Sequence, residues 1–472
     1  MTSSSTDPAR PDPLLPTTQR ALLHRVAVGQ SEGRSPSLVA AVARDGLLSW
    51  SGARSCVDGH VPDVDTQYRI GSITKTFTAV LVMRLRDEGL LDLGDPLEKH
   101  LPGTGAGELT IHQLLSHSGG LRAEPPGDWW ERTPGSLRPA LSDTLGDGAV
   151  LHPAGRRHHY SNPGYALLGA VVERLRQDTW AEVLRREILL PLSLGRTTVQ
   201  PAAPHAGGWA VHPWADAMLP EPLQDLGVMA PAGQLWSTAG DLCRFGAFLV
   251  RGDARVLSAE SVREMRAPSA PPEPDDWASG YGLGVQLAQR GGRTLAGHTG
   301  SLPGFLACLW THGDEGLVSV ALANATSGPA IGAIAADLLA TVADAEPRIP
   351  DAWRPMENFD NGLLEIAGQW YWGTNAYGLK LVADGGLELY PLSGSGRGSR
   401  FVATANTDGA GEVSVGRTWR GLDGYYAGEA LRIVRSADGS VSHLDLGTFV
   451  LTRQPYDPAE AVPGGVDGDG WR

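Results

Sequence analysis

The stretch Ser72-Ile73-Thr74-Lys75 stands directly before residues 77–83, a segment that is apolar except for one threonine. A segment that is apolar on all sides predicts a buried helix rather than a surface helix. A spacing of three residues places the hydroxyl of Ser72 and the amine of Lys75 on one face of this helix, within hydrogen-bonding reach. The sequence therefore predicts a buried helix that begins with a serine and a lysine side by side.

This pair of side chains suggests chemistry, because a serine hydroxyl is a weak nucleophile until a base takes its proton. Lys75 could be that base if burial lowers its pKa from the usual value of about 10.4. The free N–H groups at the start of the helix would suit an oxyanion. The alternative is a helix-capping serine with a solvated lysine. Lysine occurs in this chain only as Lys75, Lys99 and Lys380, which favours a specific role for Lys75.

A second candidate motif is Tyr160-Ser161-Asn162, which follows a loop rich in Gly, Arg and His and precedes a helical pattern. In an irregular segment, residues two apart can point the same way. The phenol of Tyr160 could then relay a proton near Ser72, and the amide of Asn162 could bind Lys75 and a substrate carbonyl. The alternative is a tyrosine packed in a turn, with Asn162 capping the next helix.

A third candidate motif, His298-Thr299-Gly300, ends a predicted strand. Glycine at that point would let a substrate lie close along the edge of the sheet. Taken by itself, the motif is uninformative, and a structural turn is the favoured interpretation. Each of the three motifs occurs once, in this order, at a helix start, in a loop and at a strand end.

The order of apolar segments predicts the architecture of the larger part of the chain. Short runs typical of strands occur early and late, at residues 38–43, 47–53, 281–289, 293–298, 304–310 and 316–323. Helical patterns fill the middle, and a last helix is predicted at residues 331–343. We therefore expect one antiparallel sheet built from both ends of this part, flanked by helices, with a helical lobe beside it. A ligand would bind at the seam between lobe and sheet.

The remainder of the chain predicts a second domain. Residues 346–360 contain three prolines and read as a linker. Residues 361–454 hold short strand patterns spaced about 8–12 residues apart, as in a small antiparallel barrel. The three motifs all fall in residues 19–345, which would form the larger domain. Residues 1–18 and the acidic residues 455–472 are expected to be disordered tails.

Composition narrows the possible partners. A net charge of −14 leaves no basic surface for nucleic acid and disfavours an anionic membrane. No apolar run reaches the roughly 18 residues of a membrane span, and the N-terminus lacks a signal-peptide pattern. Cys56, Cys243 and Cys308 lack metal-ligand spacing and read as buried free thiols, which suit a reducing compartment. We expect a cytoplasmic protein without metal, cofactor, nucleic-acid partner or membrane partner.

The three motifs resemble those of the penicillin-recognising serine hydrolases, in particular the class C β-lactamase-like branch with its esterases, D-aminopeptidases and D-amino-acid amidases. The resemblance covers about residues 20–345. It includes Arg69-Ile70-Gly71 before the serine and the segments 90–95, 114–121, 231–233 and 237–242. It implies a β-lactamase/transpeptidase-like fold and an acyl-enzyme intermediate. The strands that begin at residue 368 resemble the lipocalin-like β-domains appended to D-aminopeptidases.

The same resemblance implies a role for each candidate residue. Ser72 would be the nucleophile, Lys75 its base or orienting partner, and Tyr160 a general acid and base. The backbone N–H groups of Ser72 and Ser301 would form the oxyanion hole. The residues that would bind the substrate are Asn162, His298, Thr299 and Gly300.

Two departures from the family pattern affect the predicted activity. The β-lactamases and carboxypeptidases of the family usually carry Lys-Thr-Gly where this chain has His298-Thr299-Gly300, and the lysine charge would normally meet a substrate carboxylate. The second motif has the Tyr-x-Asn form rather than Ser-Asp-Asn. Deacylation would therefore use Tyr160 and Lys75 rather than a separate glutamate.

We therefore predict a serine hydrolase that acts on a small ester or amide, with esterase-like activity first. D-aminopeptidase or D-amino-acid amidase activity and weak β-lactamase activity are the alternatives within this class. A catalytically silent ligand-binding or sensor protein is the alternative from another class.

Overall fold

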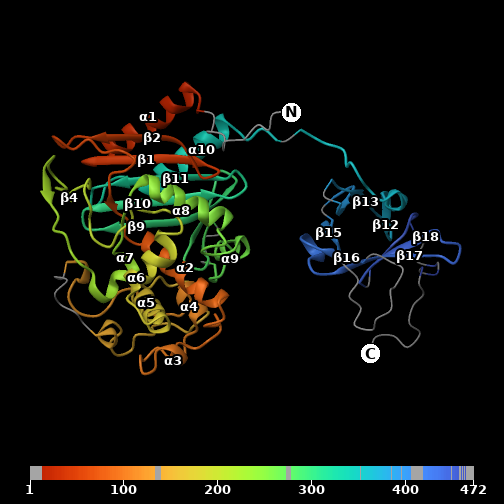
Figure 1. Cartoon of the computed structure of the whole chain (residues 1–472), viewed down its shortest axis with the longest axis horizontal. Coiled ribbons are helices and arrows are strands. Elements are labelled where there is room, and N and C mark those ends of the chain that lie inside the picture. The colour runs from red at the N-terminus through yellow and green to blue at the C-terminus, as the bar shows by residue number, and fades with distance from the viewer. Residues whose placement is uncertain are drawn as a thin grey trace, which may run out of the picture. The chain divides into compact units, whose positions relative to one another are not determined.

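The computed structural model describes residues 13–132, 140–272, 278–350, 352–383, 385–394, 396–404, 418–447 and 449–455, and also residues 459, 461 and 463. The chain forms two compact units, Met1–Arg348 and Ile349–Arg472 (Figure 1). Each unit has a hydrophobic core of its own. Most of the predicted tails, residues 1–18 and 455–472, lies outside the described residues.

The first unit is built on a seven-stranded antiparallel sheet (Figure 1). In their order across the sheet, the strands are β2 (Leu47–Ser55), β1 (Ser37–Arg44), β11 (Leu317–Ala323), β10 (Phe305–His312), β9 (Arg293–Leu302), β8 (Gln286–Arg290) and β7 (Ser279–Tyr281). Two strands come from the start of the unit and five from its end. The predicted antiparallel sheet from both ends is therefore confirmed. Two short pairs lie outside it, β3 (Tyr68–Arg69) with β6 (Trp236–Ser237) and β4 (Trp209–Val211) with β5 (Met218–Pro220).

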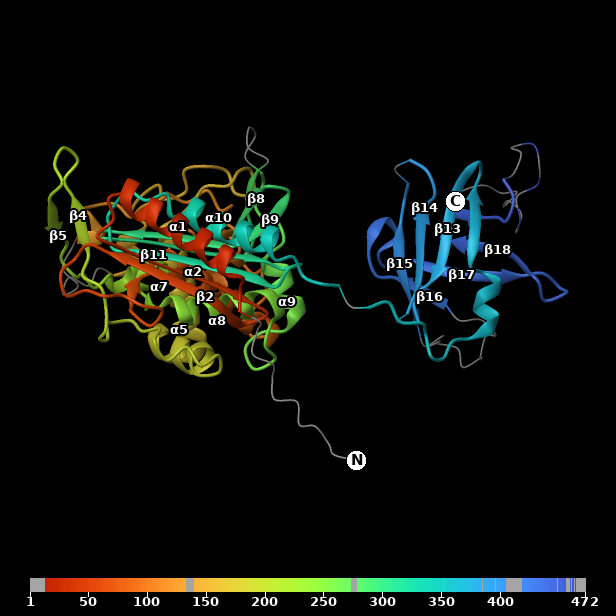
Figure 2. The ribbon, with the colours of Figure 1, turned by 90° about the horizontal axis from the view of Figure 1, so that it is seen from above.

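Helices cover both faces of this sheet because the side chains of β1 alternate between two cores. Leu38, Ala40 and Val42 belong to the core beneath α1 (Pro16–Glu32) and α10 (Ile331–Ala345), which lie together on one face (Figure 2). Val39, Ala41 and Ala43 face the opposite core, shared with α2 (Ile73–Asp87), α5 (Asn162–Arg176) and α8 (Ala239–Arg251). Helix α2 is thus enclosed between the sheet and the helical lobe.

The middle of the chain forms the predicted helical lobe. Besides α2, α5 and α8, the first unit contains α3 (Leu97–His100), α4 (Ile111–Leu115), α6 (Trp180–Leu184), α7 (Ala230–Gly233), α9 (Ala259–Met265), a π-helical turn η3 (Arg185–Leu189) and the 3-10 turns η1 (Trp130–Arg132), η2 (Leu141–Thr144) and η4 (Gly227–Met229). Every residue of α2 from Ile73 to Met83 is buried. This agrees with the prediction of a buried helix.

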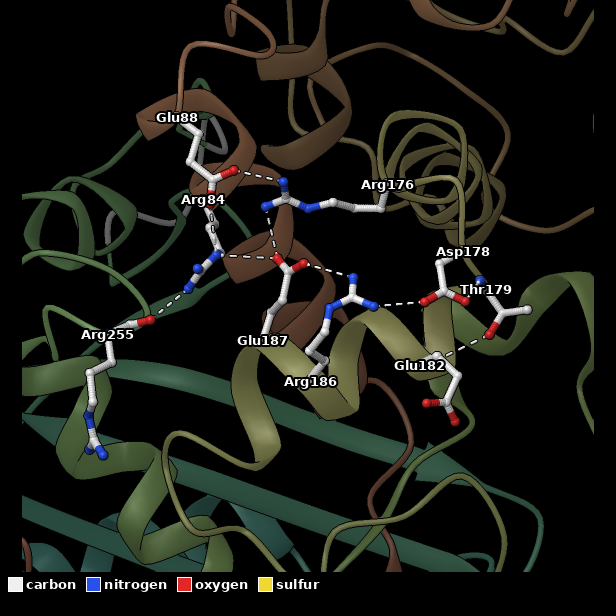
Figure 3. A network of polar contacts seen from close by, with 9 residues as sticks. All are labelled: Arg84, Glu88, Arg176, Asp178, Thr179, Glu182, Arg186, Glu187 and Arg255. Carbon is white, nitrogen blue, oxygen red and sulfur yellow. Dashed lines mark hydrogen bonds and ion pairs between the residues drawn. The ribbon is translucent and has the colours of Figure 1, made fainter.

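An ion network joins the C-terminal ends of α2 and α5 (Figure 3). Glu88 accepts hydrogen bonds from Arg84 at 3.0 Å and from Arg176 at 2.7 Å. Arg176 also donates to Glu187 at 2.8 Å, and Arg186 donates to the other oxygen of that carboxylate at 3.0 Å. Helix α2, which follows its N-cap Ser72, and helix α5, which begins at Asn162, are therefore tied to each other at their C-terminal ends.

The segment predicted as one strand, residues 281–289, is a tight hairpin instead. Strand β7 ends at Tyr281 and β8 begins at Gln286, and these two residues pair across the hairpin. Gly284 has a φ of +74°, and a Cβ atom there would lie 2.2 Å from the Cβ of Ala79 in α2. The hydroxyl of Thr76 donates to the carbonyl of Gly284 at 2.8 Å. Glycine thus allows a turn that packs against α2, and the prediction of one strand was wrong.

The second unit is a near-closed antiparallel β-barrel. Its strands are β12 (Gly368–Trp372), β13 (Asn375–Leu381), β14 (Leu387–Pro391), β15 (Ser399–Thr404), β16 (Thr418–Gly421), β17 (Ala430–Arg435), β18 (Val441–Leu446) and β19 (Phe449–Leu451), with short turns η5 (Asn361–Glu365) and η6 (Gly424–Tyr426). The backbones of Tyr371 and Thr452 exchange two hydrogen bonds of 2.8 Å, which join the first and last strands. Trp370, Phe401 and Trp419 are buried inside. The predicted barrel-like all-β domain is confirmed.

Three general expectations can be compared with the structure. Cys243 and Cys308 are buried free thiols, whereas Cys56 is exposed, contrary to expectation. Within the described ranges, no helix has both the length and the apolar character needed to span a bilayer. Within the same ranges, no three His, Cys, Asp or Glu side chains are grouped as metal ligands would be.

A chain that ends at Arg348 should fold without the barrel. Both core clusters of the first unit and all three motifs lie before that residue. We expect a single cooperative thermal transition by circular dichroism and labelling by a fluorophosphonate probe at the rate of the full chain. An insoluble product, or one without a cooperative transition, would show that the first unit depends on the second.

Candidate active site

The first motif forms a buried serine–lysine pair. Ser72 is the N-cap residue of α2, and the Nζ atom of Lys75 donates to its Oγ at 3.1 Å and to the carbonyl of Ala232 at 2.8 Å. Lys75 has no exposed surface. Burial lowers its pKa from 10.5 to about 7, although the charges of Glu124 and Glu131 act in the opposite direction. Near neutral pH, a large fraction of this amine is therefore unprotonated and able to accept a proton.

Tyr160 lies beside this pair. Its ring centroid is 4.9 Å from the Nζ atom of Lys75, and its hydroxyl is in hydrogen-bonding contact with Ser72. Burial raises the pKa of Tyr160 above its usual value, and the contact with Ser72 only partly offsets this. The phenol therefore keeps its proton at neutral pH and is suited to donate it. The structure thus brings Ser72, Lys75 and Tyr160 together.

Asn162 is the first residue of α5 and points toward a glutamate. Its Nδ2 atom donates to the Oε1 atom of Glu124 at 2.7 Å, and the indole of Trp130 donates to the other carboxylate oxygen at 2.7 Å. The sequence predicted that Asn162 would bind Lys75, but no hydrogen bond joins the two among the described residues. The amine of Lys75 instead donates to the carbonyl of Ala232.

His298 is buried, with 1% of its surface exposed. Its Nδ1 atom lies 2.5 Å from the carbonyl oxygen of Thr299. Because a carbonyl only accepts, Nδ1 carries the ring proton, and Nε2 accepts from the hydroxyl of Tyr281 at 3.0 Å. Burial, together with the nearby charge of Lys75, lowers the pKa of His298 to about 3. The ring is therefore neutral and presents no free nitrogen to a substrate.

The end of β9 lies directly against the start of α2. A Cβ atom on Gly300 would lie 1.9 Å from the carbonyl oxygen of Ile70 and 3.1 Å from the backbone nitrogen of Ser72. Gly71 has a φ of +50°, and a Cβ atom there would lie 2.7 Å from the backbone nitrogen of Ser301. Two glycines therefore permit the contact that brings the backbone nitrogens of Ser72 and Ser301 to one corner of the site.

His117, a buried histidine to which the sequence analysis assigned no role, packs against the ring of Tyr160. The Nδ1 atom of His117 accepts from the backbone N–H of Ser161 at 3.1 Å, so the proton is on Nε2. That atom is buried and has no partner within the described residues. The rings of His117 and Tyr160 lie 4.2 Å apart between centroids. The segment 114–121 belonged to the family resemblance and could have drawn attention to His117.

Other residues at the site were also missed because they come from distant parts of the chain. They are Glu124, Ala232, Tyr281 and Gln286. Glu124 carries no motif that would signal a role, whereas Ala232 lies in the segment 231–233, which belonged to the family resemblance. For the other two a signal existed, since the closely spaced glycines 282 and 284 mark a turn inside the apolar run.

Comparison with protein families matches residues 20–344 to the family described as "Beta-lactamase". Residues 359–453 match a domain of unknown function, DUF7586. A curated relative, "Beta-lactamase-like protein 2" of Dictyostelium discoideum, is 26% identical over 275 residues, which are 54% of this chain and 50% of the relative. The chain thus spans about half the length of that relative.

Solved structures with the same fold include two of interest. The octameric penicillin-binding protein homologue from Pyrococcus abyssi is 21% identical, with a TM-score of 0.62 over 92% of this chain and 99% of its own. At 21% identity, this likeness supports the fold and says nothing about activity. The D-stereospecific amidohydrolase from Streptomyces sp. is 26% identical, with a TM-score of 0.54 over 70% of this chain and 98% of its own.

Proposed function

Because the chain belongs to the beta-lactamase family, we propose that it is a serine hydrolase that forms an acyl-enzyme on Ser72 and hydrolyses a small ester or amide. One observation carries this proposal. The amine of Lys75 is buried, has a pKa of about 7, and lies 3.1 Å from the Oγ atom of Ser72. A desolvated amine beside a hydroxyl at a helix start is what an activated serine nucleophile requires.

Acylation would begin when the Oγ atom of Ser72 attacks the substrate carbonyl carbon and its proton passes to the Nζ atom of Lys75. The carbonyl oxygen becomes an oxyanion beside the backbone N–H groups of Ser72 and Ser301, and also beside the positive end of the α2 dipole. Tyr160 then donates its proton to the leaving oxygen or nitrogen and regains one from Lys75. The bond to the leaving group breaks, and an alcohol or amine departs.

Deacylation would use the same groups in reverse order. A water molecule attacks the acyl carbon, and one of its protons passes to Lys75, directly or through Tyr160. The bond between the acyl carbon and the Oγ atom of Ser72 then breaks, and the serine oxygen takes back a proton. A carboxylic acid leaves, and the enzyme returns to its starting protonation state.

Esters are the substrates that we place first. The ring of His298 is neutral and buried, so the third motif supplies no cation to a substrate carboxylate. An ester also has the easier leaving group and needs no such anchor. We also propose that the first unit belongs to the class C-like branch that includes esterases. The barrel would be related to lipocalin-like domains, and the protein would be cytoplasmic.

A second candidate is an ester or amide that carries a free ammonium group, such as a D-amino-acid amide. Two carboxylates act on the charge of Lys75: Glu124, which is held by Asn162 and Trp130, and Glu131. Burial raises the pKa of Glu131. Neither carboxylate has an ion-pair partner among the described residues. The likeness to a D-stereospecific amidohydrolase also supports this candidate.

Ser72→Ala should lower kcat/KM for a nitrophenyl ester by about 10³-fold or more, because it removes the nucleophile. Its thermal unfolding should match that of the wild type. Ser327→Ala, at an exposed serine, is the matched control and should keep full activity. A fluorophosphonate probe should modify the peptide that contains Ser72 in the wild type only. Activity of Ser72→Ala within about tenfold of the wild type would refute the proposed nucleophile.

The activity should depend on pH through Lys75. The reaction needs the neutral amine, and the protonated form predominates below its pKa of about 7. We therefore expect kcat/KM for a neutral ester to rise by about tenfold per pH unit below this value and to level off above it. Lys99→Met, at an exposed lysine, should leave the profile unchanged. An inflection near about 10.4, the ordinary value for lysine, would contradict a desolvated base.

Glu124→Gln tests the second candidate, because glutamine keeps an acceptor for Asn162 but loses the charge. If the site binds an ammonium group, kcat/KM for a D-alanine nitroanilide should fall by about tenfold relative to its N-acetyl analogue. Glu108→Gln, at an exposed carboxylate, should not change this ratio. If the wild type has equal kcat/KM values for the free and the acetylated substrate, the proposed ammonium-binding site is refuted, and the proposal of ester hydrolysis is unaffected.

A further inference from the structure

The hairpin between β7 and β8 holds the third motif from two sides. Tyr281 and Gln286 pair with each other across the hairpin. The hydroxyl of Tyr281 reaches His298, and the side chain of Gln286 reaches Thr299. Neither hairpin residue belongs to any of the three motifs, yet together they contact two of the residues in the third motif.

The geometry of the sheet shows which backbone groups of β9 face the site. Strands β9 and β10 pair from Leu302–Phe305 onward, around a two-residue turn. Residues that close such a turn are hydrogen-bonded to each other, and bonded and non-bonded pairs alternate from there along an antiparallel ladder. The N–H and C=O groups of Thr299 and Ser301 therefore point away from β10. Strand β8 begins at Gln286, opposite Gly297, so it does not cover these groups.

All the hydrogen-bonding groups of Thr299 are nevertheless occupied. Its backbone N–H lies 2.9 Å from the Oε1 atom of Gln286, and its Oγ1 atom lies 3.1 Å from the same oxygen. A backbone N–H only donates, so the facing amide atom of Gln286 must be oxygen, and the threonine hydroxyl must donate to it as well. The carbonyl of Thr299 accepts from His298. Along this edge, the N–H and O–H donors of Thr299 are already bonded, whereas the described residues provide no hydrogen bond to the backbone groups of Ser301.

Tyr281 fixes the orientation of the His298 ring, which in turn bonds to the carbonyl of Thr299. Its hydroxyl donates to the Nε2 atom of His298, which orients the ring so that Nδ1–H meets the carbonyl of Thr299. Lys75, Tyr160 and His117 face the same ring from α2 and from the loops before α5. His298 therefore has no remaining N–H for a substrate, and its role is to position Thr299.

We propose that Gln286 is a specificity-determining residue, which closes the donors of Thr299 and so excludes substrates that carry a carboxylate beside the scissile bond. This inference rests on the proposed hydrolase function. A carboxylate placed at this edge would meet the lone pairs of the Gln286 oxygen instead of two donors. A neutral group would lose nothing there, because it needs no donor.

The test compares two leaving groups that differ in one charge. meta-Carboxyphenyl acetate and its methyl ester present the same acyl group to Ser72. The measured quantity is the ratio of kcat/KM for the anionic ester to that for the neutral ester, divided by the same ratio for spontaneous hydrolysis. In the wild type this ratio should be well below one.

Gln286→Ala should raise the ratio by about tenfold, because it frees an N–H and an O–H donor for a charged acceptor. Gln286→Met, which keeps most of the side-chain volume, should act in the same direction and serves if the alanine variant is unstable. Gln289→Ala is the matched control: Gln289 lies in the same strand and donates to Thr294 at 2.8 Å, away from the site. It should leave the ratio as in the wild type.

Several results would overturn the inference. A wild-type ratio at or above one would mean that the edge does not exclude anions. An unchanged ratio in both Gln286 variants would remove the residue from specificity, and a lower ratio would mean that Gln286 itself binds the carboxylate. An equal rise in Gln289→Ala would point to general loosening of the strand. Absence of neutral-ester turnover and of Ser72 labelling would instead refute the hydrolase function, so the two failures are distinguishable.

Discussion

The burial of one amine is the constraint on which the rest of the site depends. A fall in the pKa of Lys75 from 10.5 to about 7 corresponds to roughly 5 kcal/mol of differential stabilisation between its two protonation states. Such a shift requires that bulk water be displaced from around the Nζ atom. The sheet, the lobe helices and the carbonyl of Ala232 together provide this enclosure. The packing of sheet and lobe therefore keeps bulk solvent away from the Nζ atom of Lys75.

Close backbone contact is the second requirement, and glycine makes it possible. Gly300 allows β9 to touch the backbone of residues 70–72, and Gly284 allows the hairpin tip to touch α2 at Ala79. Through these two contacts, α2, the edge of β9 and the hairpin form one packed group. The hairpin can then influence the third motif although it lies outside all of the sequence motifs.

The sequence predicted the parts of the structure that depend on local pattern. The apolar run after Lys75 predicted a buried helix, and the strand patterns at the two ends of the larger unit predicted its antiparallel sheet. The hairpin at residues 281–289 was missed because its apolar residues continue through the turn and conceal it. The partners of the site residues could not be predicted either. Glu124 reaches the site from a loop and Ala232 from the short helix α7, far along the chain from Lys75. The tautomer of His298 depends on a carbonyl and a hydroxyl that spacing does not reveal.

The position of Gln286 has a consequence for how such enzymes diverge. Gly300 cannot accept any side chain, since a Cβ atom would lie 1.9 Å from a carbonyl oxygen, and the groups around Lys75 are fixed by its burial. Gln286, in contrast, is partly exposed at the end of a hairpin, and its side chain bonds to Thr299 rather than to Ser72 or Lys75. If Gln286 limits the substrate as proposed, a substitution there would change which substrates fit and leave Gly300 and the surroundings of Lys75 as they are. Proteins with this fold could then diverge in substrate specificity while the reaction itself stayed the same.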